Sequence, residues 1–379
     1  MSNKTRVLIL GAGFGGLELS SRLSDSLADQ VEVTLIDKNE GFIFGFSKFD
    51  LMLGRSSRSD VTYFYKDIAK PAVEFRQETV LSIDPVNRMV TTDKQSYETD
   101  VLVVALGAEF NIDSTPGFAE GGQEFYSVPG AIALHDTLKT FKAGKLVIGI
   151  IGQPFKCPPA PCEAAMLLDE WFEERGVADD IDISVVSQWA VPIPPSPDGT
   201  KAILKKFEER GLKFVTEHVI TSLDPERKVA VCADGQEVPY DLFLGVPVHR
   251  VPTVVEEAGL SENDWIPVDD KNLATKFPGV YAIGDVTSAP VPKSGVFAES
   301  AARAVAEHLI AEITGEGEPE PFDGLGSCYV EFGDELVGRM DANFFPGTRP
   351  TAPFAQPSVS VADEKKEFAA VRRKRWIDG

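Results

Sequence analysis

The sequence contains few cysteines and no long apolar run. Only four cysteines occur in 379 residues, at positions 157, 162, 232 and 328, too few for the disulfide framework of a secreted protein. No stretch approaches the ~20 apolar residues of a membrane-spanning helix. The N-terminal apolar run opens into glycines instead of a signal cleavage site. We therefore expect a cytoplasmic protein without a transmembrane segment, whose cysteines are core thiols, metal ligands or redox groups.

Positive charge is also scarce, since 37 Lys and Arg residues face 59 Asp and Glu residues, giving a net charge of −22. Most of such a surface would repel the phosphates of nucleic acid, so we expect no nucleic-acid partner. The local exception is "KKEFAAVRRKRW" at 365–376. Its basic residues and its apolar Phe368, Val371 and Trp376 are compatible with weak peripheral contact with the inner face of a membrane. A solvated tail that contacts another subunit is the alternative.

Two stretches of the chain show the same α/β pattern. Residues 6–37 read as a buried strand, a helix and a second strand, and residues 144–188 repeat this order. The segments "SYETDVLVVALGAEF" (96–110) and "EVPYDLFLGVPVHRVP" (237–252) also resemble each other. This weak internal repeat predicts two related α/β domains in tandem. The acidic, Pro- and Gly-rich segment 315–324 is the expected linker.

The segment "GAGFGG" at 11–16 follows the first strand and opens the first helix. In this G-x-G-x-x-G frame Gly11 allows a tight turn, Gly13 lets the backbone approach a pyrophosphate, and Gly16 permits close helix–strand packing. The helix N-terminus then favours the negative charge of the phosphates. Asp37 ends the next strand, where a carboxylate can accept ribose hydroxyls. The segment predicts a site for FAD or NAD, in preference to NADP.

A second cofactor segment is "GVYAIGDVTSAPVPKSGVFAES" at 279–300. A strand ends at Gly284-Asp285, where the acid can hold a cofactor hydroxyl. A helix begins near Gly295 and points its amides at an electron-rich ring, and Lys293 adds positive charge just before it.

The equivalent turn of the second unit reads "GQPFKCPPAPCEAA" (152–165) and lacks a glycine-rich loop. Pro158 and Pro159 remove amide donors that a phosphate would require. We therefore expect thiol chemistry there in place of phosphate binding. A thiolate at a helix N-terminus has a lowered pKa, and Lys156 would lower the pKa of Cys157 further.

Together, the glycine motif, "ALGA" (105–108) and "AIGD" (282–285) resemble the flavoproteins with two dinucleotide-binding domains, over most of residues 5–345. Within them, "KCPPAPCEAA", "VPKSGVFAE" and "GSCYVEFGD" resemble the sulfide:quinone oxidoreductase and flavocytochrome c sulfide dehydrogenase branch. This resemblance implies an α/β fold of two tandem Rossmann-like domains, with a discontinuous FAD domain. The expected division is 1–111 plus 251–316 for FAD, 112–250 for the second domain, and 317–379 for a C-terminal interface region.

The resemblance also implies the site. Cys157 and Cys328 would form a redox-active disulfide beside the flavin, Glu163 would assist proton transfer, and Lys293 would stabilise the anionic reduced ring. FAD would be bound non-covalently, because no cysteine occurs between residues 17 and 156. The expected cofactor-binding residues are Gly11, Gly13, Phe14, Gly15, Gly16, Asp37, Lys38, Val80, Gly107, Gly284, Asp285, Lys293 and Gly295. No metal site is expected.

Alternatives remain at this stage. Cys157 and Cys162 form a C-x₄-C pair that could carry the disulfide, although we favour Cys157–Cys328 and expect Cys162 and Cys232 to be core thiols. The function expected from the resemblance is oxidation of sulfide or a related sulfur species, with electrons passing through FAD to a quinone. The alternative is an NAD(P)H-dependent flavoprotein that reduces a quinone, disulfide or persulfide. A homodimer is expected.

Overall fold

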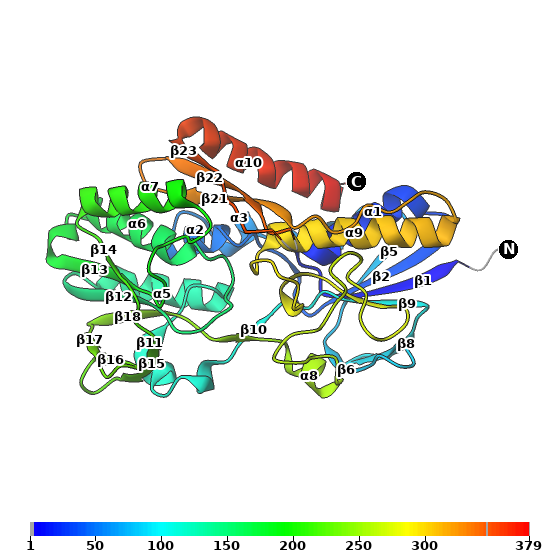
Figure 1. The fold of residues 1–379 in the computed structure, drawn as a ribbon, viewed down its shortest axis with the longest axis horizontal. Coiled ribbons are helices and arrows are strands. Elements are labelled where there is room, and N and C mark those ends of the chain that lie inside the picture. The colour runs from blue at the N-terminus through cyan, green and yellow to red at the C-terminus, as the bar shows by residue number, and fades with distance from the viewer. Residues whose placement is uncertain (1–3, 346–347, 379) are drawn as a thin grey trace.

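The structure is a computed structural model that describes residues 4–345 and 348–378. Residues 1–3, 346–347 and 379, which the predicted domain ranges include, lie outside the described residues. Two α/β units lie at opposite ends of the molecule, and a C-terminal layer crosses one face of both (Figure 1).

The first unit is built on a parallel five-stranded sheet in the order β20-β9-β1-β2-β5. Continuous apolar runs form these strands because both faces of the sheet are covered. Helices α1 and α9 pack side by side along it (Figure 1). The bounds are β1 (Thr5–Leu10), α1 (Phe14–Leu27), β2 (Val31–Asp37), β5 (Val73–Gln77), β9 (Val101–Val104), β20 (Val280–Ala282) and α9 (Gly295–Thr314).

The second unit repeats this arrangement with a parallel sheet in the order β11-β18-β12-β13-β14. Its elements are β11 (Gly122–Gln123), α5 (Val128–Thr140), β12 (Gly144–Ile150), α6 (Ala160–Glu173), β13 (Ile181–Val186), α7 (Pro197–Arg210), β14 (Lys213–Val215) and β18 (Leu242–Val246). Helix α2 (Ser47–Leu53) comes from the first part of the chain but packs against α5 and α6.

Each unit also carries a three-stranded antiparallel meander just before a sheet strand. These are β6 (Val80–Asp84), β7 (Met89–Thr92) and β8 (Ser96–Glu98) in the first unit, and β15 (Ile220–Asp224), β16 (Val229–Cys232) and β17 (Glu237–Pro239) in the second. The tandem Rossmann-like fold predicted from the sequence is confirmed. The first sheet draws strands from residues 5–104 and 280–282, and the second from 122–246. The domain boundaries within the connecting segments stay a prediction.

The remaining elements join and cover the two units. The short connecting elements are β3 (Gly41–Phe42), α3 (Arg58–Val61), β4 (Tyr63–Phe64), β10 (Glu109–Phe110), α4 (Phe118–Gly121), β19 (His249–Arg250) and α8 (Thr253–Glu257), with single 3₁₀ turns at Tyr65–Asp67, Ile112–Ser114, Ala178–Asp180 and Gly284–Val286. The C-terminal layer consists of the antiparallel strands β21 (Leu325–Glu331), β22 (Val337–Asn343) and β23 (Phe354–Ser358), helix α10 (Val359–Arg373) and a final turn η5 (Lys374–Asp378).

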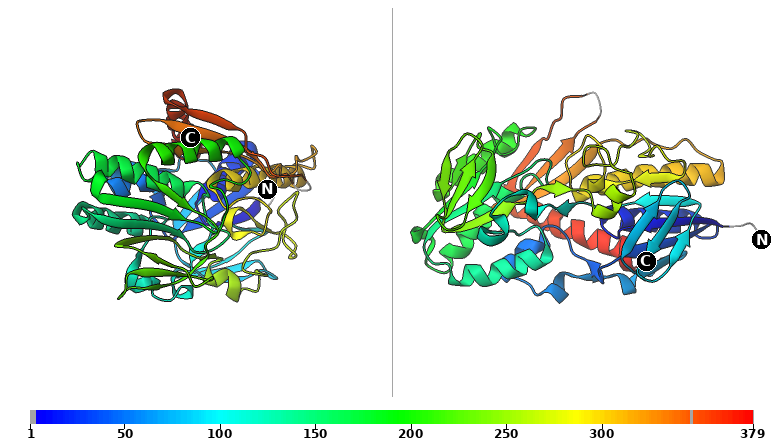
Figure 2. Two further views of the ribbon diagram at one scale, coloured as in Figure 1. Left: turned by 60° about the vertical axis from the view of Figure 1, so that its left-hand side comes forward. Right: turned by 90° about the horizontal axis from the view of Figure 1, so that it is seen from below.

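The C-terminal basic segment docks on the first unit (Figure 2). The indole Nε1 of Trp376 donates to Glu18 at 2.7 Å, and its ring packs 5.5 Å from that of Phe14. Arg375 bridges two buried acids, Glu18 of α1 at 2.6 Å and Glu299 of α9 at 2.7 Å. Trp376 is buried in this structure and is therefore not available for the membrane contact predicted for the apolar residues of the tail.

Phe368 also packs against the core of the first unit, whereas Val371 is exposed. The tail is therefore held by internal ion pairs and aromatic contacts. Among the described residues, none of the helices combines the length and apolar character that a bilayer crossing requires.

Candidate active site

The glycine loop has the geometry that its sequence predicts. Gly11 has φ +101°, and a Cβ there would lie 2.3 Å from the carbonyl oxygen of Ala105. A Cβ on Gly16 would lie 1.9 Å from the oxygen of Gly11, so this helix packs too closely for any side chain. In contrast, a Cβ on Gly13 would meet nothing within 4 Å. The loop is therefore closed behind Gly11 and Gly16 and open in front of Gly13.

The other residues predicted to bind the cofactor differ in their contacts and exposure. Asp37 ends β2, and its Oδ2 accepts from the amide of Ala12 at 2.8 Å, so the carboxylate helps to shape the loop. Gly107 has φ +68° and open space around its missing Cβ. Lys38 is exposed, and Val80 is half-buried at the start of β6. Neither has a contact that singles it out as a cofactor ligand.

The start of α9 approaches the start of α1. A Cβ on Gly295 would lie 2.3 Å from the ring of Phe14, so the missing side chain lets that ring fill the gap between the two helices. Gly15 is buried against Ile283. The N-termini of the two helices therefore lie close together.

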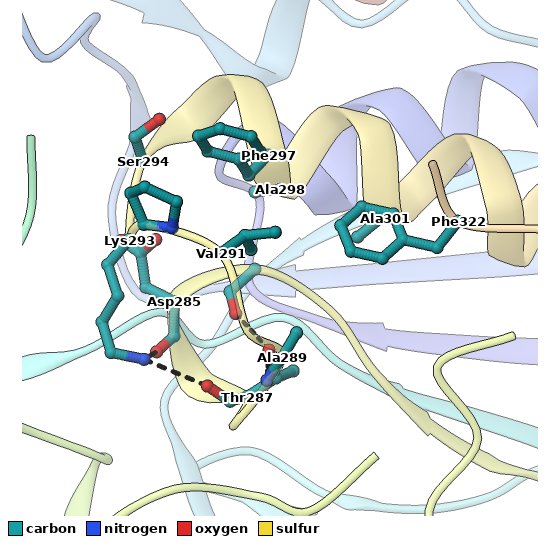
Figure 3. A pocket seen from close by; sticks show the side chains of 12 residues that line it. Asp285, Thr287, Ala289, Val291, Lys293, Ser294, Phe297, Ala298, Ala301 and Phe322 are labelled. Carbon is teal, nitrogen blue, oxygen red and sulfur yellow. Dashed lines mark hydrogen bonds between the residues drawn. The ribbon is translucent and has the colours of Figure 1, made fainter. Parts of the chain in front are cut away.

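A pocket at the start of α9 contains Gly284, Asp285, Lys293 and Ser294 (Figure 3). Lys293 is buried, and its Nζ donates to the carbonyl oxygens of Asp285 at 2.7 Å and Thr287 at 3.0 Å. The same Nζ lies 3.2 Å from the centroid of the Trp265 ring. Burial lowers the pKa of Lys293 to about 8, although the Asp285 carboxylate opposes this shift.

These residues fit the flavin nucleotide that the sequence predicts. A Cβ on Gly13 would meet no atom within 4 Å, so the loop is open on this side, where the adjacent helix N-terminus would offer amides to a pyrophosphate. Among the described residues, none donates a hydrogen bond to the Asp285 carboxylate, which is therefore available to a ribityl hydroxyl. Gly11, Gly13, Asp37 and Asp285 would hold the nucleotide, and Lys293 would place positive charge near its ring. A bound flavin would supply a two-electron acceptor.

Cys157 lies in the loop before α6 and has the left-handed φ of +51°. Its amide donates to the carbonyl oxygen of Lys293 at 2.8 Å, and its carbonyl accepts from Ala160 at 2.9 Å. This pairing joins the cysteine loop of the second unit to the loop before α9 of the first.

The predicted lowering of the pKa of Cys157 is wrong for this structure. Burial raises the pKa of the thiol, and the nearby Glu163 carboxyl and Cys328 raise it further. The amide of Ala160 at the start of α6 lowers the pKa of Cys157 but does not offset burial, and the prolines at 158, 159 and 161 have no N–H to add to it. The free amides of the first turn are also used locally, since Cys162 and Glu163 both donate to the carbonyl of Pro159.

Lys156 does not have the predicted role either. Its Nζ donates to the carbonyl oxygen of Ala108 at 2.7 Å and lies 5.0 Å from the ring centroid of Phe110. The ammonium group that lowers the pKa of Cys157, against these larger effects, is Lys48 of α2. Burial lowers the pKa of Lys48 itself to about 8, and the charge of Lys156 lowers it further. Lys48 was missed because its site neighbours come from distant parts of the chain.

Cys328 reaches the same region from β21. Its sulfur lies 3.8 Å from the hydroxyl of Ser294, the residue that follows Lys293. Burial raises the pKa of Cys328 to about 11, against the effect of the Ser294 hydrogen bond. The dipeptide Lys293-Ser294 therefore contacts both cysteines, one through its backbone and the other through a side chain. All four cysteines are free thiols in this structure.

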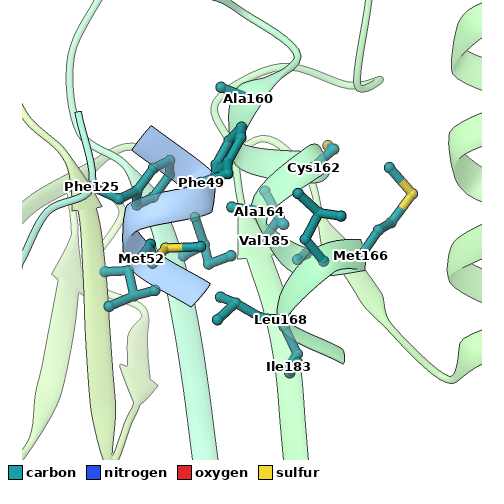
Figure 4. Close-up of a cluster of buried hydrophobic side chains, with 14 of the residues drawn as sticks. Phe49, Met52, Phe125, Ala160, Cys162, Ala164, Met166, Leu168, Ile183 and Val185 are labelled. Atoms are coloured by element: carbon teal, nitrogen blue, oxygen red, sulfur yellow. The ribbon is translucent and has the colours of Figure 1, made fainter. Parts of the chain in front are cut away.

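Cys162 and Cys232 occupy different surroundings. Cys162 is buried in the core of the second unit among side chains such as Phe49 and Ala164 (Figure 4), and burial raises its pKa. Cys232 is the last residue of the meander strand β16 and is buried. Its sulfur and donor atoms of His218 and Asp234 lie within 4.8 Å of one another. His218 and Asp234 form a 3.2 Å hydrogen bond, which accounts for their proximity without a metal.

Glu163 is buried in the first turn of α6, and its Oε1 accepts from the amide of Glu331 at 2.9 Å. Burial raises its pKa to about 8, against the effect of Lys365 from α10. Glu331 is held by Arg55 at 3.0 Å and by Lys365. The raised pKa leaves Glu163 able to hold or release a proton near neutral pH, beside two thiols whose pKa values it affects.

His249 lies behind the cysteine loop as a neutral ring. Its Nδ1 lies 2.7 Å from the carbonyl oxygen of Pro247, and its Nε2 accepts from the amide of Lys156 at 3.4 Å. Burial lowers its pKa to about 3, so this side chain does not take up protons at neutral pH. Its ring packs against Tyr126, another residue that the sequence did not reveal.

The fold and the two cofactor segments define a two-domain flavoprotein, and comparison with known proteins identifies the family. Residues 5–307 match the pyridine nucleotide-disulphide oxidoreductase family. The chain belongs to this family of FAD-dependent oxidoreductases.

Individual relatives are distant in sequence. The chain is 24% identical over 343 residues to the mitochondrial sulfide:quinone oxidoreductase of Dictyostelium discoideum, covering 87% of this chain and 76% of that protein. It is also 24% identical to a type II NADH:quinone oxidoreductase of Staphylococcus aureus, over 97% of this chain and 99% of the other. The crystal structure of the sulfide:quinone oxidoreductase from Aquifex aeolicus superposes with a TM-score of 0.87 at 22% identity, covering 99% of this chain and 93% of that one.

Proposed function

We propose that the protein oxidises sulfide, or a related small sulfur species, at a Cys157–Cys328 redox pair and passes the electrons through FAD to a quinone. The observation that supports this most strongly is the convergence of the two cysteines on Lys293-Ser294. The Cys157 amide lies 2.8 Å from the Lys293 carbonyl, and the Cys328 sulfur lies 3.8 Å from the Ser294 hydroxyl. The relatives named as sulfide:quinone oxidoreductases support the same function.

The proposed chemistry begins with the pair oxidised to a disulfide. Hydrosulfide attacks the sulfur of Cys328, a new sulfur–sulfur bond forms, and the Cys157–Cys328 bond breaks. The electron pair of the broken bond stays on Cys157 as a thiolate, and Cys328 carries a persulfide. A second hydrosulfide can remove the outer sulfur as a disulfide anion, which leaves the dithiol. Reoxidation of the Cys157–Cys328 dithiol to the disulfide releases two electrons and two protons, and a bound FAD would be the acceptor of these electrons.

Glu163 is the residue that this proposal uses for proton movement. Hydrosulfide and thiolate differ from their neutral forms by one proton, and the pKa of Glu163 is about 8. A carboxyl group with such a pKa can take up a proton from bound hydrogen sulfide and return it to the product. Glu163 is buried, and its charge acts on the pKa values of both thiols.

The alternative is an NAD(P)H-dependent quinone reductase, which the likeness to the Staphylococcus aureus enzyme over nearly the full length of both chains favours. The cysteine loop weighs against it, because Pro158 and Pro159 stand where a dinucleotide phosphate would need amide donors. Hydride transfer from a nicotinamide also requires no cysteine pair, so this alternative leaves Cys157 and Cys328 without a role.

Anaerobic stopped-flow absorbance separates the two functions. We expect sulfide to reduce the flavin and bleach its absorbance during the stopped-flow measurement, whereas NADH should leave the flavin oxidised. Decylubiquinone should then reoxidise the reduced flavin and restore the absorbance. Bleaching by NADH and none by sulfide would establish the alternative. Cys157→Ser and Cys328→Ser should each lose sulfide oxidation with FAD still bound. Cys232→Ser, in the remote meander, is the matched control and should keep the wild-type rate.

The finer features of the proposal follow the sequence predictions. FAD binding is proposed to be non-covalent, since residues 17–156 contain no cysteine. A cytoplasmic location at the inner face of a membrane and a homodimeric state are likewise proposed. Denaturation followed by filtration tests the first, because non-covalent FAD passes into the filtrate.

A further inference from the structure

Two buried acids lie just inside the helices that follow the cofactor loops. Glu18 is four residues after the start of α1 at Phe14, and Glu299 is four residues after the start of α9 at Gly295. Their exposed fractions are 0% and 2%. The loop before α1 carries the glycine motif, and the first turns of α9 line the pocket that contains Asp285. Each acid therefore lies about one helical turn beyond a loop of the candidate FAD site.

Arg375 of the C-terminal segment joins these two acids. Its guanidinium lies 2.6 Å from a carboxylate oxygen of Glu18 and 2.7 Å from one of Glu299. Charge neutralisation does not require this bridge, because each acid already pairs with an arginine of its own helix. These pairs are Glu18–Arg22 at 2.7 Å and Glu299–Arg303 at 3.3 Å. The bridge adds a connection between α1 and α9 near their first turns.

Trp376 contacts the glycine motif itself. Its indole ring is buried and packs edge to face with the ring of Phe14 at 5.5 Å, while its Nε1 donates to Glu18 at 2.7 Å. Phe14 is the fourth residue of the motif. Its ring occupies the space beside Gly295, where a Cβ would lie 2.3 Å from it. The Phe14 ring is therefore held between the start of α9 and the indole of the C-terminal segment.

A second path connects the C-terminal segment with the glycine motif. The amide of Ala69 donates to the carbonyl oxygen of Ile377 at 2.9 Å. The hydroxyl of Tyr65, a buried residue, donates to the carbonyl oxygen of Ala12 at 2.7 Å. Ala12 is the second residue of the motif. Residues 65–69 therefore contact the C-terminal segment at one end and the glycine motif at the other.

We propose that docking of residues 372–378 and binding of FAD stabilise each other. Docking fixes the spacing of the two helix starts and the position of the Phe14 ring, so the loops keep the shape that the nucleotide requires. Arg375 and Trp376 are positioning residues in this proposal, because they act through side chains of α1 and α9. The inference concerns retention of the cofactor and does not depend on the identity of the substrate.

Such a coupling must be reciprocal. If docking of the segment raises the affinity for FAD by a given factor, FAD raises the stability of the docked segment by the same factor. A segment that only covers the first unit would undock equally often with and without FAD. The dependence of undocking on FAD therefore distinguishes the proposed role from a merely structural one.

Limited proteolysis of the wild-type chain measures this dependence. Trypsin cleaves after Arg and Lys, and residues 372–375 read "RRKR". Cleavage there requires the local backbone to unfold, so its rate reports undocking. We expect saturating FAD to slow cleavage within 372–375 about tenfold relative to the FAD-free chain, as followed by intact-mass spectrometry.

Arg227 and Lys228 provide the control within the same digest. Both are exposed in the turn between β15 and β16 of the second unit, and cleavage after them should not depend on FAD. Equal protection of the two regions would show that FAD stabilises the whole chain, and this result would overturn the proposed coupling. Equal cleavage within 372–375 with and without FAD would overturn it as well.

Substitution of Trp376 tests the reverse direction of the coupling. Trp376→Ala removes the indole from the ring of Phe14, and we expect FAD to leave the diluted holoenzyme about tenfold faster, measured by the rise in flavin fluorescence. Val371→Ala is the matched control, because Val371 is an apolar residue of α10 with an exposed fraction of 47%. It should release FAD at the wild-type rate. Thermal unfolding verifies that each variant is folded, and a wild-type release rate in folded Trp376→Ala protein would remove Trp376 from this role.

These measurements separate the inference from the proposed function. Protection of residues 372–375 by FAD in a protein that does not oxidise sulfide would support the coupling and reject the proposed substrate. Sulfide oxidation in a protein whose cleavage within 372–375 ignores FAD would support the proposed function and overturn the coupling.

Discussion

The main-chain amide of Cys157 donates to the carbonyl oxygen of Lys293, with an N···O distance of 2.8 Å. This bond connects the loop before α6 to the loop before α9, so it ties the thiol of one unit to the cofactor segment of the other. Cys328 meets the next residue, Ser294, from the C-terminal layer. The site therefore assembles from three separate parts of the chain.

The open space at Gly13 separates cofactor binding from folding. A Cβ on Gly13 meets nothing within 4 Å, whereas one on Gly11 would lie 2.3 Å from the Ala105 oxygen. We expect Gly13→Ala to fold normally but to bind FAD at least tenfold more weakly, which is about 1.4 kcal/mol. Fluorescence titration of the apoprotein measures the affinity. Wild-type affinity in Gly13→Ala would place the phosphates elsewhere, and Gly11→Ala should fail to fold stably.

Glu163 should make stability fall as pH rises. Its folded pKa of about 8 exceeds its ordinary value of 4.5, so between these values the unfolded chain releases a proton that the folded protein retains. The unfolding free energy should decrease across this window and level off above pH 8. Urea unfolding at pH 5.5 and 8.5 should show a drop on the order of 2 kcal/mol that Glu163→Gln abolishes.

The control for this measurement lies on the same helix. Glu173 ends α6 and its side chain is 60% exposed, so Glu173→Gln should retain the wild-type pH dependence. An equal drop in Glu163→Gln and the wild type would show that other groups cause it.

The C-terminal segment should secure the first unit. Removing the charges of Arg372 and Arg375 leaves the buried Glu18 and Glu299 short of partners, although Arg22 and Arg303 remain. We expect the double substitution to glutamine to lower the unfolding free energy by about 3 kcal/mol and to increase FAD loss on dilution.

Arg373 on the same helix is the comparison, since its side chain is 58% exposed. Arg373→Gln should change stability by less than about 0.5 kcal/mol. If Arg373→Gln and the double substitution lowered the unfolding free energy equally, the loss of basic charge, and not of the buried pairs, would be the cause of the destabilisation.

Lys293 should raise the midpoint potential of the flavin. We propose that the flavin ring lies near Lys293, and with this positive charge removed, reduction of the ring to an anion would become less favourable. We expect Lys293→Met to lower the midpoint potential on the order of 30 mV, equivalent to about 1.4 kcal/mol for two electrons. Dye equilibration measures this potential. Lys276→Met, at an exposed ion pair with Glu262, should have no effect, and the same potential in both variants would remove Lys293 from this role.

The sequence predicted the parts of the site that depend on local patterns. Gly11 and Asp285 follow buried strands, and the chain must turn there whatever its distant contacts are, while Gly16 lies in the first turn of the helix that follows Gly11. The fold class followed from the same strand and helix periodicity. The convergence of Cys157 and Cys328 was expected from the family resemblance alone, because their spacing carries no such information.

Other features depend on tertiary contacts that no local pattern encodes. The basic tail was interpreted as surface, yet Trp376 reaches Glu18, 358 positions away. Lys156 adjoins Cys157 in sequence but binds the carbonyl of Ala108. Tyr126 lies in a connecting segment without a motif. The sequence shows whether a residue is apolar or charged, but the tertiary packing determines which residue it contacts.

The most direct test of the account is the pairing of the oxidised cysteines. We expect mass spectrometry of an unreduced digest of the air-oxidised holoenzyme to find the peptide containing Cys157 linked to the peptide containing Cys328, with Cys162 and Cys232 unlinked. A disulfide between Cys157 and Cys162, or four free thiols after oxidation, would contradict it.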